Sequence, residues 1–165
     1  PRQRAALSIY STLLGGSMGS RLFSEIREKL GLAYSVSAFG HAHADVPLLQ
    51  LSAGLDSEKC VEAYARMREI VSDLRENGPT EEEVSRARSY AAGARVLAFE
   101  RSGTVASYAA GQAIVRREPV DPDSAITALD DVSFDEVDAV ARGIGTDAAV
   151  ACVGPHDAEE FAVAG

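Results

Sequence analysis

Several residue types that mark specialised proteins are scarce in this sequence. Tryptophan is absent from the 165 residues, and cysteine occurs twice, as Cys60 and Cys152. No C-x-x-C spacing joins them, so neither a zinc knuckle nor a redox pair is predicted; we expect two buried free thiols, with a single disulfide as the alternative. This cysteine usage suits a reducing compartment, and a cytoplasmic location is expected. No run of roughly 18 apolar residues occurs, so no membrane span is predicted.

Positive charge is also scarce. The sequence has 16 Lys and Arg residues against 25 Asp and Glu residues, which gives a net charge of −9. A nucleic acid would be repelled at long range by such a surface, so a nucleic-acid partner is not predicted. The hydrophobic fraction of 46% and charged fraction of 25% are those of a globular chain,. We expect residues 1–165 to form one domain with one core.

Histidine, the commonest metal ligand, occurs three times, as His41, His43 and His156. His41 and His43 would point to one side of a strand and Asp45 could join them, but no fourth ligand is suitably spaced. We therefore expect solvated histidines and no metal site in this chain. The glycine-rich stretch 15–20 lacks the Gly-Lys-Ser/Thr ending of a phosphate-binding loop, so a turn between two helices is the preferred interpretation.

The hydrophobic pattern predicts an α+β fold. Two runs with a period of two residues predict a hairpin, and a third apolar run near the end predicts another strand. The predicted strands are 32–39, 48–55 and 148–153, and the alternation in the first places Tyr34 on the same side as Val36,. Capping residues and apolar stripes predict helices over 5–14, 20–30, 57–77, 80 onward, 102–117, 124–129 and 135–142,. Ser20 is expected to cap the second helix, and Thr80 with Glu83 and Ser133 with Glu136 are expected to form capping boxes. Because helices follow one another between the hairpin and the last strand, we expect helices on one face of a mostly antiparallel sheet, with a ferredoxin-like unit as the alternative.

Arg27 and Tyr34 are the candidate catalytic residues. Arg27 lies near the end of a predicted helix and Tyr34 near the start of the following strand, with Gly31 between them. A guanidinium and a phenol at such a junction can both donate hydrogen bonds to a carbonyl or an oxyanion, as acyl-transfer chemistry requires. Taken alone, the packing of a tyrosine and the solvation of an arginine are the simpler explanation.

The segment from Leu14 to Val36 reads LGGSMGSRLFSEIREKLGLAYSV. It resembles the second homologous domain of pitrilysin-family zinc peptidases of the mitochondrial processing peptidase type. The shared features are small residues followed by Ser-Arg-Leu-Phe, Arg-Glu-Lys and Gly-Leu-Ala-Tyr. The later order of hairpin, long helix, Gly-Pro-Thr-Glu-Glu-Glu and further helices is also similar, so the resemblance covers nearly the whole chain.

The resemblance implies a role for this chain. In that family the first domain holds zinc through an inverted His-x-x-Glu-His motif, which this sequence lacks. The zinc would therefore be held by a homologous domain or partner subunit. By the same resemblance, Tyr34 would donate to the oxyanion of peptide hydrolysis and Arg27 would hold a substrate carbonyl. We expect a substrate-binding, transition-state-assisting domain of a zinc endopeptidase that acts on unfolded peptides and is inactive alone.

Two alternatives remain at this point: an inactive scaffold or recognition subunit of the same family, and an acidic α+β binding module without a protease context. The family domain begins with a strand before its first helix, whereas this sequence begins at that helix. We therefore expect the first strand to be missing and the sheet to have an open edge. Self-association or assembly with another chain through that edge is the predicted consequence.

Overall fold

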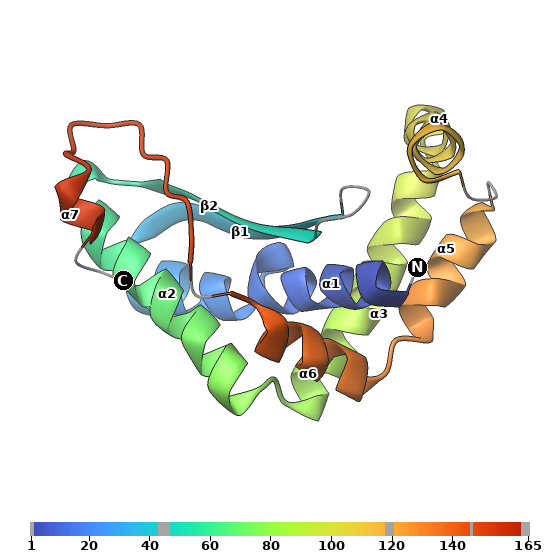
Figure 1. Cartoon of the computed structure of the whole chain (residues 1–165), viewed down its shortest axis with the longest axis horizontal. Helices are drawn as coiled ribbons and strands as arrows, with labels where there is room; N and C mark the ends of the chain where they lie inside the picture. The colour runs from blue at the N-terminus through green and yellow to red at the C-terminus, as the bar shows by residue number, and fades with distance from the viewer. Residues whose placement is uncertain (1, 43–46, 118–120, 146, 163–165) are drawn as a thin grey trace.

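The computed structural model describes residues 2–42, 47–117, 121–145 and 147–162. A hairpin of strands β1 (Ala33–Ala42) and β2 (Pro47–Leu55) lies across a layer of helices (Figure 1). The helices and helical turns are α1 Arg2–Ser11, η1 Thr12–Gly16, η2 Phe23–Lys29, η3 Ser57–Lys59, α2 Cys60–Asn77, α3 Glu81–Phe99, α4 Ser102–Ala110, η4 Gly111–Arg116, α5 Pro122–Asp130, α6 Phe134–Gly143 and α7 Glu159–Ala162. The predicted α+β class is confirmed.

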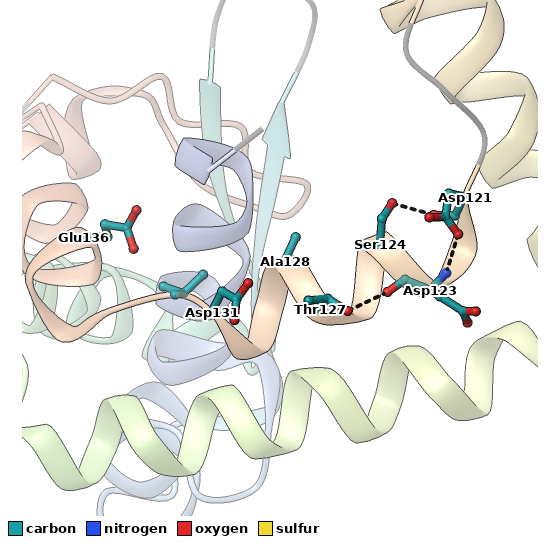
Figure 2. Close-up of a pocket in the computed structure, with 8 residues that line it drawn as sticks. Asp121, Asp123, Ser124, Thr127, Ala128, Asp131 and Glu136 are labelled. Atoms are coloured by element: carbon teal, nitrogen blue, oxygen red, sulfur yellow. Dashed lines mark hydrogen bonds between the residues drawn. The ribbon is translucent and has the colours of Figure 1, made fainter.

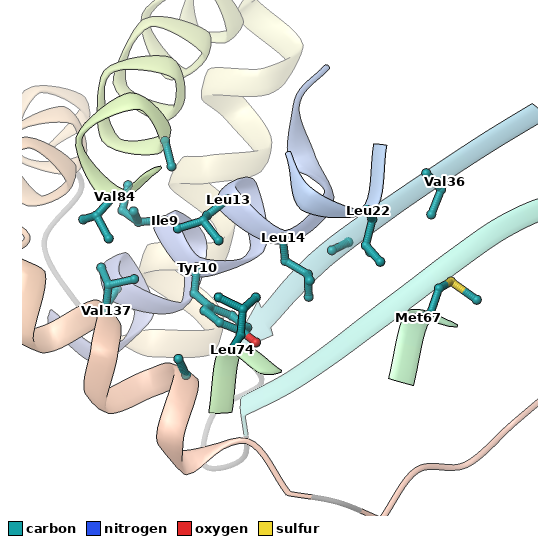
Figure 3. Packing of buried hydrophobic residues seen from close by; sticks show 14 of the residues in the cluster. Ile9, Tyr10, Leu13, Leu14, Leu22, Val36, Met67, Leu74, Val84 and Val137 are labelled. Atoms are coloured by element: carbon teal, nitrogen blue, oxygen red, sulfur yellow. The ribbon is translucent and has the colours of Figure 1, made fainter. Parts of the chain in front are cut away.

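The core forms around α1, which contacts the hairpin on one side and α3, α5 and α6 on others. Ile9, Tyr10 and Leu14 are completely buried there (Figure 3). Gly15 in η1 allows the helix layer to approach the sheet, because a Cβ atom at this position would lie 2.6 Å from the backbone nitrogen of Ala38 in β1. The predicted turn glycine is therefore also a packing glycine.

Helices α3 and α6 begin at the capping residues that the sequence predicts. Thr80 caps α3: its hydroxyl accepts a hydrogen bond from the Glu83 N–H at 3.2 Å, and the Glu83 carboxylate accepts one from the Thr80 N–H at 2.8 Å. Ser133 and Glu136 form the same reciprocal pair at the start of α6. Both predicted capping boxes are confirmed. The predicted cap at Ser20 is wrong, because its hydroxyl instead donates to the Ser17 carbonyl at 2.6 Å.

The predicted strand 148–153 is wrong. These residues form no ladder with the part of the chain that the structure describes, and Val150 and Val153 are exposed. An apolar run becomes a strand only when a neighbouring strand satisfies its backbone groups, and among the described residues β1 and β2 pair only with each other,. In the described ranges, no helix is both long and apolar enough to cross a membrane.

Candidate functional site

The candidate site is the turn that joins η2 to β1. Gly31 adopts a φ of +59°, in the left-handed region that favours glycine, and the Leu32 N–H donates to the Ile26 carbonyl at 2.9 Å,. This pattern ends η2 abruptly and directs the chain into the sheet. The Lys59 ammonium, at the end of η3, donates to the Gly31 carbonyl at 2.9 Å and fixes the turn against the segment after β2.

Tyr34 points outward because the strand is irregular at this point. The period-two pattern placed Tyr34 on the same side as Val36, but the pairing register shifts between Ala33 and Ser35. Val36 is buried, whereas 69% of Tyr34 is exposed, so this part of the prediction is wrong. A local bulge changes side-chain parity and re-aims a residue, which is a common device beside functional sites.

The Tyr34 hydroxyl donates a hydrogen bond of 2.6 Å to the Asp56 carboxylate, just after β2. This hydrogen bond, reinforced by the negative charge of Asp56, raises the pKa of Tyr34 above its usual value of 10.0. The phenol is therefore protonated at neutral pH and remains a hydrogen-bond donor. The Lys59 ammonium lies 4.0 Å from the Asp56 carboxylate.

Arg27 lies on the exposed side of η2. Its guanidinium packs over the Phe23 ring, with 4.9 Å between the guanidinium carbon and the ring centroid. Among the described residues it makes no ion pair, and no hydrogen bond joins it directly to Tyr34. The Tyr34 phenol is thus held by Asp56, and the Arg27 guanidinium is held against Phe23. No described residue pairs with the N–H groups of Arg27.

Arg21 anchors the segment that carries Arg27. It donates two hydrogen bonds to the Glu83 carboxylate, at 2.7 and 3.0 Å, and one to Asp73 at 2.6 Å. Burial alone would raise the pKa of Glu83, but the hydrogen bonds from Arg21 and Thr80 outweigh it and lower the pKa to about 2. Sequence reasoning missed this link, because the partners lie on α2 and α3, more than 50 residues away.

The surface has two hollows in its described part that merit description. One, of about 460 Å³, lies beside Arg21 and is lined by residues of the η2 segment, α2 and α3. Another, of about 440 Å³, lies along α5 and the start of α6 (Figure 2). Two of its four acids have structural partners: Asp121 accepts from the Asp123 N–H at 3.1 Å, and Glu136 closes a capping box. Neither Arg27 nor Tyr34 lines either hollow.

The potential metal ligands are distributed differently from the prediction. His41 lies near the exposed end of β1 with its ring 6.3 Å from that of Phe39, and His43 and Asp45 fall outside the described residues. The prediction of two buried thiols is wrong, since Cys60 is half-buried and Cys152 is exposed. Instead, ligand atoms of Cys60, Cys152 and His156 lie within 4.8 Å of one another. Their wide separation along the sequence concealed this group.

Comparison with known proteins identifies the family. Residues 1–90 match the family described as the peptidase M16 inactive domain. The chain belongs to this family. An uncharacterized zinc protease of Streptomyces coelicolor is 32% identical over 154 residues, which are 93% of this chain and 34% of that protein. The predicted resemblance to the second, inactive domain of pitrilysin-type zinc peptidases is thereby confirmed.

Solved structures share the fold. The peptidase M16 inactive domain from Pseudomonas fluorescens matches with a TM-score of 0.70 and 24% identity, over 87% of this chain and 34% of that one. A chain of complex III2 from Candida albicans matches with a TM-score of 0.68 and 16% identity, over 85% of this chain and 34% of that one. This chain spans about a third of the length of the curated relatives it matches.

Proposed function

We propose that this chain is the substrate-binding, transition-state-assisting domain of a zinc endopeptidase that hydrolyses peptide bonds in unfolded peptides. The observation that carries the proposal is the outward-facing Tyr34, protonated and placed by a break in the strand register beside the turn after η2. Family membership and the zinc-protease names of the relatives support the peptidase context.

The catalytic zinc that the relatives' names imply does not fit the residues at this site. Arg27 and Tyr34 are hydrogen-bond donors at neutral pH, not metal ligands, and the sequence contains no His-x-x-Glu-His motif,. We assign that zinc to a homologous domain or partner subunit, which makes such a partner and a peptide substrate the expected binding partners. This chain alone is expected to be inactive.

Tyr34 supplies a donor for negative charge that develops on the carbonyl oxygen of the cleaved bond. In the free domain its proton is directed at Asp56, so the hydroxyl must exchange that hydrogen bond for one to the substrate. Its exposure leaves room for this rotation. Arg27, packed on Phe23 and otherwise unoccupied among the described residues, holds a backbone carbonyl of the bound peptide,.

The decisive experiment compares Tyr34→Phe with Tyr90→Phe in the complete enzyme. Tyr90 is also exposed, lies on α3, and makes no hydrogen bond through its hydroxyl to the described residues. Loss of one oxyanion donor lowers turnover by ~100- to 1,000-fold while KM stays nearly constant. Steady-state kinetics on an unstructured peptide measures both constants. Full turnover by Tyr34→Phe would refute the catalytic role.

An inactive scaffold or recognition subunit is the second candidate function. The fold match to a chain of complex III2 favours it, because a chain of this shape occurs in a large assembly. The two candidates differ in their partner: the enzyme requires a companion domain or subunit with the inverted zinc motif. A complete protein that lacks this motif, and that recruits no partner carrying it, would support the scaffold.

A further inference from the structure

The carboxy-terminal segment brings three potential metal ligands to the start of α2. Cys60 is the first residue of α2, and the segment containing Cys152 and His156 passes beside it before entering α7, which packs against α2 (Figure 1). One ligand atom from each residue lies within 4.8 Å of the other two.

His156 is oriented as a ligand. Its side chain is only 9% exposed, and its Nδ1 lies 3.2 Å from the Glu160 carboxylate. The Phe161 ring packs edge-on against the imidazole, with 5.6 Å between ring centroids. The second ring nitrogen of His156, Nε2, is buried and has no hydrogen-bond partner in the described structure. Buried nitrogens without a partner are rare in native proteins, so this atom requires an explanation.

We propose that Cys60 Sγ, Cys152 Sγ and His156 Nε2 bind one divalent cation of the zinc class. Two thiolates and an imidazole are the ligands that borderline-soft zinc prefers to hard cations such as magnesium or calcium. Around a tetrahedral zinc, with bonds of about 2.0 to 2.3 Å, ligand atoms lie roughly 3.3 to 3.8 Å apart. From separations of up to 4.8 Å, a contraction of at most about 1.0 to 1.5 Å would complete the site,. This revises the expectation that the chain contributes no metal ligand.

Glu160 strengthens the assignment. A histidine that binds a metal usually directs its second ring nitrogen at a carboxylate, which fixes the tautomer and raises the basicity of the ligand. Glu160 occupies that position toward Nδ1 of His156. Three protein ligands leave a fourth coordination position for water or a group from a partner. The bound ion would fasten the carboxy-terminal segment to the start of α2.

A disulfide is the competing explanation for the paired sulfurs. It would join Cys60 to Cys152 but would leave the buried Nε2 of His156 without a partner. A metal ion accounts for both sulfurs, for Nε2 and for the carboxylate behind the imidazole. The metal site is therefore the interpretation that uses all four observations, and it does not depend on the proposed peptidase function.

Cobalt(II) titration of the complete, reduced protein under anaerobic conditions tests the site. We expect a thiolate-to-cobalt charge-transfer band and tetrahedral d–d bands that saturate at one ion and disappear when zinc is added. Thiolate absorption reports only on cysteine ligands, so metal bound elsewhere through nitrogen and oxygen does not contribute. Cys60→Ser and Cys152→Ser should each abolish or strongly reduce the charge-transfer band.

His156→Ala should weaken cobalt binding, and Glu160→Gln should weaken it by ~10- to 100-fold through the second ring nitrogen. Glu159→Gln, on the neighbouring exposed carboxylate of α7, and His41→Ala should leave the titration unchanged. Circular dichroism verifies that each variant is folded. If a ligand variant unfolds, Glu160→Gln still tests the site, because it leaves all three ligands in place. A reduced protein without a charge-transfer band would overturn the proposal. A titration insensitive to both His156→Ala and Glu160→Gln would overturn it as well.

Discussion

Glu83→Gln removes the negative charge that Arg21 binds and leaves a side chain of nearly the same shape. Glutamine can still accept the hydrogen bond from Thr80, so the capping box at the start of α3 is retained,. The substitution therefore isolates the ionic contribution of Glu83. Arg21 keeps Asp73 as its other partner, at 2.6 Å.

The pKa of Glu83 sets the expected size of the effect. A decrease from 4.5 to about 2 corresponds at most to about 3.4 kcal/mol in the free energy of unfolding,. The side chains of Arg21 and Glu83 are 22% and 17% exposed, so solvent screens part of this energy and about 1 to 2 kcal/mol is expected,. Because the pKa is lower in the folded state, the stabilisation is present above pH 4.5 and is lost as the pH falls toward about 2,.

Urea denaturation between pH 7 and pH 3, followed by circular dichroism, measures this contribution. Wild type should exceed Glu83→Gln in stability by about 1 to 2 kcal/mol at pH 7, and the difference should shrink toward pH 3. Other carboxylates titrate in both proteins and cancel in the difference. Glu82→Gln, whose wild-type side chain is 87% exposed, is the matched control and should have little effect. A difference that stays constant with pH would refute the reasoning.

Three further predictions follow from the structure. Arg27→Ala in the complete enzyme should raise KM, because a guanidinium that holds a substrate carbonyl already binds the substrate before the reaction. Steady-state kinetics measures the change, with Arg75→Ala at an exposed position as the control. Gly15→Ala should lower the free energy of unfolding by ~1 to 3 kcal/mol, because the added methyl group would clash with Ala38,. Gly93→Ala, in open space on α3, should raise it by ~0.5 to 1 kcal/mol, and urea denaturation measures both changes,. The isolated chain should associate through the hairpin edges, and light scattering that detects a stable monomer at every concentration would contradict this,.

Features set by nearby residues could be predicted from the sequence. The capping boxes at Thr80 and Ser133 depend on a partner three residues away, and both formed as expected. The hairpin depends on period-two runs on either side of a short polar stretch, and the helix 57–77 on one apolar stripe. In each case the physical cause lies within one element or between adjacent elements.

Features set by distant residues could not be predicted. The outward direction of Tyr34 depends on a register shift against β2, which changes the parity that alternation alone would give. The apolar run 148–153 has the composition of a strand but finds no strand to pair with among the described residues. The grouping of Cys60, Cys152 and His156 depends on where the carboxy-terminal segment docks. Arg27 and Tyr34 came from family resemblance, which carries information that composition and spacing lack.

The five residues from Asp56 to Cys60 have a consequence for how the domain responds to its ligands. Asp56 holds the Tyr34 hydroxyl, Lys59 holds the turn at Gly31, and the Cys60 thiol donates to the Asp56 carbonyl at 3.5 Å while facing Cys152. This short segment thus contacts both the Tyr34 turn and the carboxy-terminal segment, so a change in its conformation affects both. We expect the two to be thermodynamically linked, so that whatever orders the carboxy-terminal segment shifts peptide affinity, and bound peptide shifts the docking of that segment by the same factor.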